Sequence, residues 1–264
     1  NIGILAQVDS ITQISCFGNN DGAITVIVSG GTAGYLATWS VQPTSNQPCP
    51  IQNIQSSGTG IFTQTGLCSG TYNISVSDSN GCFSSVSASI FGPQVPLQAN
   101  LNQQNNLCYG DCNGAAFVSP YGGTAPYSHS WSNGQAGPTI SNLCLGDYYD
   151  TIVDANNCSY IVQFSITEPA TPISASHTAS MVDCFDNASG EININASGGT
   201  PGYSISWSPV PPFVSNGPQI SVSGGNYTID SLLFGTYTVI LADFNNCTDT
   251  IIVSITQPPA LIIG

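Results

Sequence analysis

One spacing pattern occurs three times along the chain, and it constrains the fold more than any single residue does. An opening cysteine is followed after 14 residues by Gly-Gly-Thr and nine residues later by a tryptophan. A Gly-x-Tyr tyrosine is followed after ten residues by a closing cysteine and eleven residues later by a proline. The three copies comprise Cys16, Gly30, Trp39, Tyr72, Cys82 and Pro93; Cys108, Gly122, Trp131, Tyr148, Cys158 and Pro169; and Cys184, Gly198, Trp207, Tyr237, Cys247 and Pro258.

The two blocks keep their spacing, whereas the segment between tryptophan and tyrosine is much shorter in the second copy than in the first and third. A tandemly repeated domain that changes length in one region has this pattern. We therefore expect a first repeat at 1–93, a second at 94–169 and a third at 170–258. Residues 259–264 resemble the approach to another opening cysteine, so we expect them to begin a fourth repeat of a longer array.

The charge of the chain excludes several classes of partner. Lysine and arginine are absent, 14 residues are acidic, and the net charge is −14. Nucleic-acid binding and attraction to anionic membranes both depend on basic side chains, so neither is expected. No apolar run is long enough for a membrane-spanning helix, so we expect no membrane span in this segment.

Ten cysteines indicate an oxidising compartment. Their spacing is not that of a metal site, since the one close pair, Cys108 and Cys112, has no second close pair. The third repeat contains only Cys184 and Cys247, which predicts a bond between them by elimination. By analogy we pair Cys16 with Cys82 and Cys108 with Cys158, which leaves Cys49 with Cys68 and Cys112 with Cys144.

Polar and apolar residues alternate in short segments, as in half-buried antiparallel strands. Ile24, Val26 and Val28 share one face, and no helical periodicity of useful length is present. Short strands, Gly/Asn turns, a strand tryptophan and the Gly-x-Tyr block predict all-β, tandem immunoglobulin-like sandwiches, each closed by an internal disulfide that points into the core, with a tyrosine corner. Asp150 occupies an inward position, so either its strand is shifted or that edge is solvated.

Several motifs together resemble the SprB-type repeat. They are Cys-Phe-Gly-Asn-Asn-Asp-Gly at 16–22, Ser-Gly-Gly-Thr at 29–32 and 197–200, Trp-Ser-Asn-Gly at 131–134, Leu-Cys-Ser-Gly-Thr-Tyr at 67–72 and Asp-Ser-Asn-Gly-Cys at 78–82. Such repeats occur in giant cell-surface adhesins of the Bacteroidota, which are exported by type IX secretion and in some species move along the cell during gliding. The resemblance implies an extracellular, multi-domain surface protein and carries over no catalytic residue.

The composition gives no support for an enzyme. The two histidines, His129 and His177, have no nucleophile motif beside them, and the common cationic anion stabilisers are missing. We expect no catalytic residue and no bound cofactor.

Turn aspartates offer one possible exception. The Asp-x-Asn turns at Asp78, Asp154 and Asp243 could donate oxygens to calcium. Each supplies one carboxylate and lacks the bidentate glutamate, so a plain turn is the preferred interpretation. The three tryptophans lie within strand patterns, which favours core positions over sugar stacking.

Four short sequences resemble the Asp-Ser/Thr-apolar motif that Bacteroidota O-glycosylate on exported proteins. The resemblance implies modification at Ser10, Thr151, Ser231 and Thr250.

We interpret the chain as a non-enzymatic structural stalk segment of a large, repetitive, secreted bacterial surface adhesin. The expected partners are neighbouring repeats of the same chain, surface polysaccharide or other adhesin and filament components, and the type IX export machinery. Two alternatives are a self-assembling subunit of an extracellular fibre and a carbohydrate-binding module. The variable segments after Trp39 and Trp207 are the expected regions of contact with a partner. Their exposed apolar residues could equally pack between neighbouring domains; they are Ile51, Ile54, Phe62, Phe213 and Val214.

Overall fold

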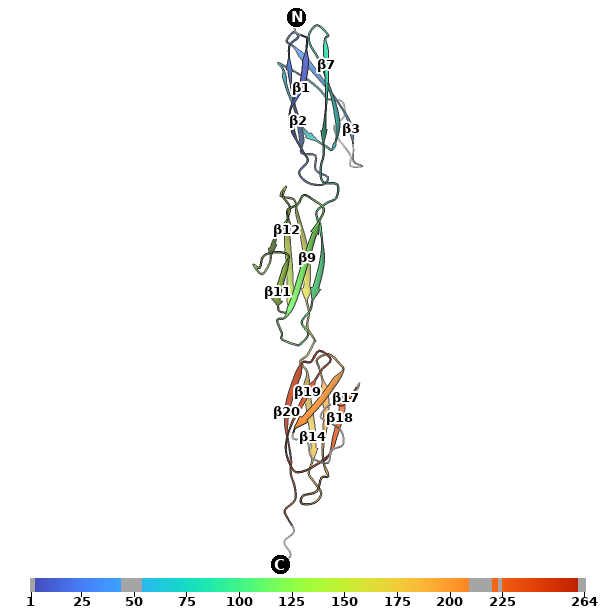
Figure 1. Ribbon diagram of the computed structural model, residues 1–264, viewed down its shortest axis with the longest axis vertical. Coiled ribbons are helices and arrows are strands. Elements are labelled where there is room, and N and C mark those ends of the chain that lie inside the picture. Colours follow the sequence, from blue (N-terminus) through green and yellow to red (C-terminus); the bar gives the residue numbers. More distant parts are fainter. Residues whose placement is uncertain (1–2, 44–53, 209–219, 223–224, 261–264) are drawn as a thin grey trace, which may run out of the picture. The chain divides into compact units, whose positions relative to one another are not determined.

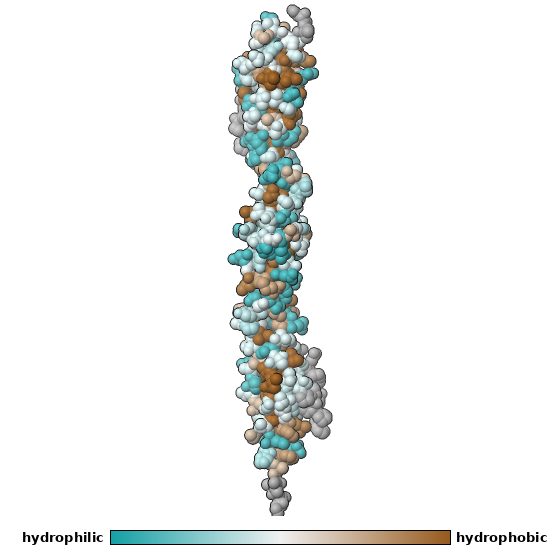
Figure 2. All heavy atoms as spheres, turned by 90° about the vertical axis from the view of Figure 1, so that its left-hand side faces the viewer, coloured by the Kyte–Doolittle hydropathy of each residue, from teal (hydrophilic) through white to brown (hydrophobic). Residues whose placement is uncertain are grey.

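The computed structural model describes residues 3–43, 54–208, 220–222 and 225–260. These residues form antiparallel strands and turns and contain no helix, which confirms the predicted all-β class (Figure 1). The described residues include no helix long and apolar enough to cross a membrane. On the face shown in Figure 2, hydrophobic residues lie in small groups separated by polar ones.

The first repeat contains two sheets. A three-stranded sheet has the order β1-β2-β5, and a four-stranded sheet has the order β4-β3-β6-β7. The strands are β1 (Leu5–Thr12), β2 (Gly22–Ser29), β3 (Tyr35–Pro43), β4 (Ile54–Gly58), β5 (Ile61–Leu67), β6 (Gly70–Ser77) and β7 (Phe83–Ile90).

The other two repeats use the same order of strands. In the second repeat the sheets are β11-β9-β8 and β10-β12-β13, and in the third they are β14-β15-β18 and β17-β16-β19-β20. The second repeat comprises β8 (Gln98–Gln104), β9 (Gly114–Tyr121), β10 (Ser128–Trp131), β11 (Thr139–Leu143), β12 (Gly146–Val153) and β13 (Ser159–Ile166). The third comprises β14 (Ser174–Ser180), β15 (Gly190–Ser197), β16 (Tyr203–Ser208), β17 (Ile220–Val222), β18 (Asn226–Leu232), β19 (Gly235–Ala242) and β20 (Thr248–Ile255).

The chain divides into two compact units that both take residues from the second repeat. One unit comprises Asn1–Leu101, Val118–Pro138 and Tyr149–Gln163, and the other comprises Asn102–Phe117, Thr139–Tyr148 and Phe164–Gly264. The predicted repeat boundaries at 93, 169 and 258 stay a prediction, and residues 261–264 of the expected fourth repeat lie outside the described part.

The alternating pattern places one face of each strand in a core. Ile24 and Val26 are fully buried in the first unit, where they belong to a cluster that includes Trp39 and Tyr72. In the second unit the cluster includes Trp207 and Tyr237. Trp131 is also buried, so all three tryptophans lie in the interior as predicted. Burial of aromatic and aliphatic side chains is the main stabilising contribution in a chain with no lysine or arginine to form salt bridges with its acids.

The tyrosine corner is present in every repeat. The hydroxyls of Tyr72, Tyr148 and Tyr237 donate hydrogen bonds of 2.9, 3.1 and 3.0 Å to the carbonyl oxygens four residues earlier. Burial raises the pKa of the Tyr72 and Tyr237 hydroxyls, which favours their protonated, donating form. These bonds fix the entry of the chain into β6, β12 and β19.

The variable segment changes the edge of one sheet. In the first repeat it adds β4 beside the tryptophan strand β3, and in the third it adds β17 beside β16. The short segment of the second repeat leaves β10 at the edge of a three-stranded sheet. The expectation that Phe62 is exposed was wrong, since it is 4% exposed and packs in the first core, with Ile54 against it. Ile51, Phe213 and Val214 lie outside the described residues.

Neither expectation for Asp150 was right. Its strand keeps the common register, because Trp131 pairs with Asp150 as Trp39 pairs with Ile74. Asp150 is fully buried and is 2.6 Å from Nδ1 of His129, and its other oxygen accepts the Ser130 N–H. The His129 ring stacks on Trp131 with a centroid distance of 6.5 Å. A hydrogen-bonded polar pair therefore replaces the apolar pair found at this place in the other repeats.

Candidate functional site

The predicted long disulfides were wrong in a systematic way. Cys16 bonds Cys158, and Cys108 bonds Cys247, with Cα separations of 5.7 and 5.6 Å. Each bond therefore joins the opening cysteine of one repeat to the closing cysteine of the next. The predicted pairs Cys16–Cys82, Cys108–Cys158 and Cys184–Cys247 are absent, and Cys82 and Cys184 are exposed free thiols.

The physical reason is strand length. In the first repeat, the Ile14 N–H bonds the Phe91 carbonyl, so the opening loop lies at the far end of β7. Cys82 precedes the near end of this eight-residue strand. Such a strand spans about 26 Å, whereas a disulfide requires Cα atoms within about 7 Å. Cys16 and Cys82 therefore lie at opposite ends of the first repeat.

The second repeat has the predicted local bond between Cys112 and Cys144. The predicted bond between Cys49 and Cys68 cannot be placed because Cys49 lies outside the described residues.

An aspartate organises each closing hairpin. One Asp78 oxygen accepts the N–H groups of Asn80 and Cys82, both at 2.9 Å, and the other accepts the Thr32 N–H at 3.0 Å. The pKa of Asp78 is lowered, and the hydrogen bond from the Thr32 N–H is the main cause. Asp154 and Asp243 make the equivalent three bonds in their own repeats. This arrangement is an Asx turn that holds the backbone of the closing cysteine.

The Gly-Gly-Thr motif is explained by the same carboxylate. The second glycine has positive φ, and a Cβ placed on it would lie 2.5 Å from Asp154 Oδ2 at Gly123 and 2.5 Å from Asp243 Oδ2 at Gly199. The threonine then supplies its N–H to that oxygen. Only glycine allows this approach, so the motif and the hairpin aspartate form one unit.

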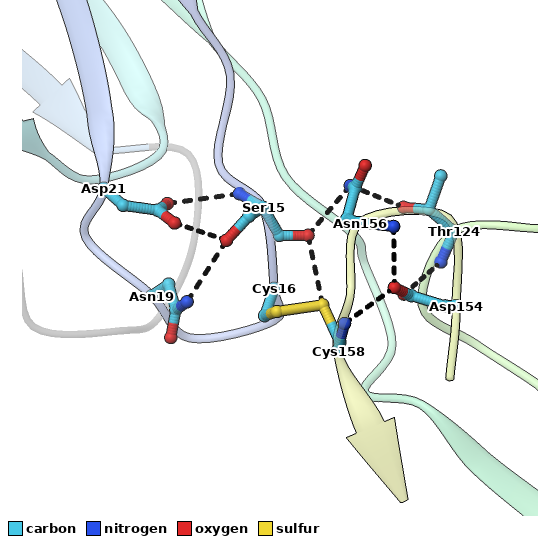
Figure 3. The surroundings of a disulfide bond; sticks show 8 residues. All are labelled: Ser15, Cys16, Asn19, Asp21, Thr124, Asp154, Asn156 and Cys158. Atoms are coloured by element: carbon cyan, nitrogen blue, oxygen red, sulfur yellow. Dashed lines mark hydrogen bonds between the residues drawn. A yellow bond between two sulfur atoms is a disulfide. The ribbon is translucent and has the colours of Figure 1, made fainter. Parts of the chain in front are cut away.

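An asparagine links each closing hairpin of the second and third repeats to the preceding repeat. Asn156 Nδ2 donates to the Thr124 hydroxyl at 3.1 Å and to the Ser15 carbonyl at 2.9 Å (Figure 3). In the next junction, Asn245 Nδ2 donates to the Thr200 hydroxyl and, at 3.1 Å, to the Leu107 carbonyl. The carbonyl that accepts always belongs to the residue before the opening cysteine. Each junction therefore combines a disulfide with an adjacent hydrogen bond.

The loop that contains the opening cysteine Cys16 forms a hydrogen-bonded turn. The Asn19 N–H bonds the Cys16 carbonyl at 3.0 Å, and Gly18 has positive φ. Asp21 accepts bonds from the Ser15 N–H and hydroxyl, and Asn19 donates to the Ser15 hydroxyl (Figure 3). Partial burial raises the pKa of Asp21, but the bonds from Ser15 and Asn19 outweigh it and the net pKa is lowered. These contacts orient the Ser15 carbonyl towards Asn156.

The other predicted site residues do not come together. His129 lies in β10 against Asp150, and His177 is exposed on β14. The described residues contain no group of three or more His, Cys, Asp or Glu side chains that could hold a metal ion. Asp78, Asp154 and Asp243 each direct both oxygens at backbone N–H groups, although calcium binding stays an untested prediction.

The sites of expected O-glycosylation all lie in strands. Ser10, Ser231 and Thr250 are exposed, and Thr151 is partly buried. Their modification stays a prediction.

Sequence reasoning missed the junction, although one signal for it was present. An asparagine precedes every closing cysteine by two residues, at Asn80, Asn156 and Asn245. The Asx turn uses only the backbone N–H of this residue, so the turn alone does not explain the constant amide side chain. The amide bonds the threonine hydroxyl of its own repeat at all three positions, and at Asn156 and Asn245 it also bonds the carbonyl of the preceding repeat.

One family of known proteins is similar to this chain once in each repeat. The family model described as SprB repeat matches residues 8–41, 100–136 and 177–211. Three regions of the chain, one in each repeat, are therefore similar to the SprB repeat. Each match contains an opening cysteine, the Gly-Gly-Thr motif and the tryptophan, and ends before the Gly-x-Tyr block. A comparison of the chain with curated proteins gives no match.

Three solved structures illustrate the similarity to known chains. One is the N-terminal eight Ig domains of Down Syndrome Cell Adhesion Molecule, at 9% identity and a TM-score of 0.39, covering 97% of this chain and 50% of that one. Another is invasin, a bacterial integrin-binding protein, at 12% identity and a TM-score of 0.34, covering 97% and 60%. A third is a tetra-tandem repeat from the extending region of a large adhesion protein, at 13% identity and a TM-score of 0.27, covering 96% and 74%. The chain thus spans less than two thirds of the length of the first two structures.

Proposed function

We propose that this SprB segment is a non-enzymatic, load-bearing stalk of a large secreted surface adhesin. The observation that carries the proposal is the pair of disulfides that join successive repeats, Cys16–Cys158 and Cys108–Cys247. Each junction has two covalent connections, the peptide linker and the disulfide. A second covalent connection suits a segment that transmits tension, because the linker then does not carry the load alone.

The bonds limit how far the chain can extend. The shortest covalent path runs through residues 1–16, crosses to Cys158, uses Cys144–Cys112 to reach Cys108, and leaves through Cys247. At about 3.5 Å per extended residue, this path has roughly a fifth of the length of the reduced chain. Even complete unfolding would therefore release little length while the bonds are intact.

Single-molecule pulling on the chain, attached at its two ends, tests the proposal. The oxidised chain should stop extending at roughly a fifth of the length reached after reduction, at about 3.5 Å per residue. The matched control C112S/C144S keeps both junction bonds and removes only the local one. It should lengthen the oxidised limit by about 110 Å, for the 32-residue separation that this bond closes. An oxidised chain that extends as far as the reduced one would refute the load-bearing role.

The proposals on export and location are supported by the similarity to the SprB repeat rather than by the geometry. We propose a cell-surface location in one of the Bacteroidota, export by type IX secretion, and attachment or gliding as the process served. The proposed partners are neighbouring SprB repeats, and beyond them surface polysaccharide or other adhesin and filament components. Deletion of the export machinery in the source organism should abolish surface labelling by an antibody against this segment, and unchanged labelling would refute this route.

A further inference from the structure

The free thiol of Cys82 lines a pocket at the end of the first repeat. At the equivalent place in the second and third repeats, the closing cysteine is bonded to the opening cysteine of the preceding repeat. Gly31, Thr32, Asp78, Asn80 and Cys82 are among the residues that line the pocket. In the second and third repeats, the equivalents of Asn80 and Cys82 bind the carbonyl and the sulfur of the preceding repeat. Cys158 is partly buried and Cys247 is 8% exposed, whereas Cys82 is exposed.

The backbone of this unfilled hairpin already has the bonded conformation. The Asp78 N–H donates to the Cys82 carbonyl at 2.9 Å, and the bonded hairpins make the same contact at 3.0 Å. Asn80 Nδ2 donates to the Thr32 hydroxyl at 2.8 Å, as Asn156 does to Thr124. Among the described residues, nothing takes the place that Ser15 has beside Asn156.

Cys184 presents the complementary half. The Asn187 N–H bonds the Cys184 carbonyl at 3.1 Å, which is the turn seen at Cys16 and Cys108. The residue two after the cysteine has positive φ in all three turns, at Gly18, Gly110 and Asp186. Cys184 is exposed, whereas the bonded Cys16 and Cys108 are partly buried.

We propose that Cys82 and Cys184 are the two halves of one further junction, each of which binds and forms a disulfide with another SprB repeat. The Cys82 half accepts an opening loop, with Asn80 donating to the carbonyl before the incoming cysteine. The Cys184 half presents its loop, with the Asp183 carbonyl as acceptor, to the closing hairpin of its partner. This inference rests on the junction geometry and does not require the stalk function.

The bond forms by thiol–disulfide exchange with a small-molecule disulfide. One thiolate attacks that disulfide, which forms a mixed disulfide and releases one small thiol. The second cysteine, as thiolate, attacks the protein sulfur of the mixed disulfide and releases the other small thiol. Two protein thiols are oxidised to one disulfide, and one small disulfide is reduced to two thiols.

A second copy of this chain is the probe, because each copy carries both halves. The interface is heterologous, so Cys184 of one copy should join Cys82 of the next in open head-to-tail chains. Two variants limit the growth of these chains to a covalent dimer. C82S retains only the opening half and C184S retains only the closing half.

The reduced variants would be incubated alone and mixed, in glutathione redox buffer at high salt, which screens the repulsion between acidic chains. We expect the mixture to give about tenfold more covalent dimer than either variant alone, since preorganised halves align the two sulfurs. Digestion and mass spectrometry should recover the Cys184–Cys82 peptide pair. Equal amounts of dimer in all three samples, or no dimer, would overturn the proposal.

A further substitution separates recognition from thiol reactivity. Asn80→Ala in the C184S chain removes the amide donor and should slow dimer formation with C82S. Asn73→Ala, which changes an exposed β6 residue outside this pocket, is the matched control and should not. Equal rates for both would overturn the assigned role of Asn80. Recovery of the Cys16–Cys158 peptide from every variant would show that the existing junctions are intact, and its loss would overturn the geometry on which the proposal rests.

Discussion

At the scale of single residues, one aspartate in each repeat carries the closing hairpin. Asp78, Asp154 and Asp243 accept three backbone N–H groups each and are 7, 5 and 3% exposed. A buried carboxylate is stable only when its oxygens are hydrogen-bonded in this way. At Asp78 these bonds lower the pKa of the carboxyl and so favour its ionised form.

The first repeat should therefore lose stability in acid. Because the pKa of Asp78 is lowered from 3.8, its contribution is present above that value and is lost as the pH falls through the lower, folded-state pKa. Denaturant midpoints measured from pH 7 downwards should fall once the pH is below about 4. Asp78→Asn should lower the midpoint at pH 7 and flatten this dependence, and a variant with an unchanged acid slope would contradict the assignment.

The buried pair of His129 and Asp150 predicts strong coupling. The equivalent residues of the third repeat are Ile205 and Val239, so H129I/D150V restores an apolar pair. Either single substitution should destabilise by about 3 kcal/mol because it leaves the other group buried without its partner, whereas the double variant should be near neutral.

Denaturant unfolding measures these changes in stability. In a background of Trp39→Phe and Trp207→Phe, Trp131 is the one remaining tryptophan, so its fluorescence reports the unfolding of the second repeat alone. The relevant quantity is the coupling energy of the double-mutant cycle. Additive effects of the two single substitutions would show that the pair does not act as a unit.

At the scale of elements, the Gly-Gly-Thr turn and the closing hairpin are coupled. Gly123→Ala should destabilise the hairpin beyond the cost of positive φ, because the new Cβ would meet Asp154 Oδ2. Gly137→Ala is a matched control, since Gly137 also has positive φ but has nothing within 4 Å of its Cβ position. Both variants should lose about 1 kcal/mol from the backbone alone. Thermal denaturation should show the larger loss for Gly123→Ala, and equal losses would contradict the coupling.

The sequence predicted these elements well and their connections badly. Alternation identified the buried face of β2, and Gly-x-Tyr identified the tyrosine corner, because both depend on residues close in the chain. The disulfides depend on which end of a strand a cysteine occupies. In the second repeat, for example, Cys158 and Ile166 have the same alternation but lie at opposite ends of β13. The alternation of inward and outward residues alone therefore could not assign the disulfide. Asp150 was misjudged because its partner, His129, lies on another strand.

At the scale of the whole molecule, the two long disulfides close overlapping covalent rings. One ring spans residues 16–158 and the other spans 108–247. Every peptide bond between Cys16 and Cys247 therefore lies within at least one ring. The pairing predicted from the sequence would have left the linkers between repeats as single covalent connections.

A cut in a linker distinguishes these two arrangements. A specific protease site inserted between Gly92 and Pro96 should be cleaved without separating the fragments, because Cys16–Cys158 spans it. Non-reducing electrophoresis should show one full-length species, and reduction should release two. The same site in a C16S/C158S chain should give two fragments without reduction. Separation of the chain that retains both cysteines under non-reducing conditions would contradict the observed pairing.

The position of Cys16 also bears on how such a chain acquires its bonds. Its partner lies 142 residues later, so Cys16 must stay reduced while Cys82, which is nearer in sequence, is already available. Folding of the first repeat resolves this conflict, because β7 then separates the two thiols by more than a disulfide can span. The sandwich thus acts as a template that protects each opening cysteine from mispairing, and oxidation that runs ahead of folding would trap the wrong isomer. Correct bonding in this molecule is a matter of timing as much as of distance.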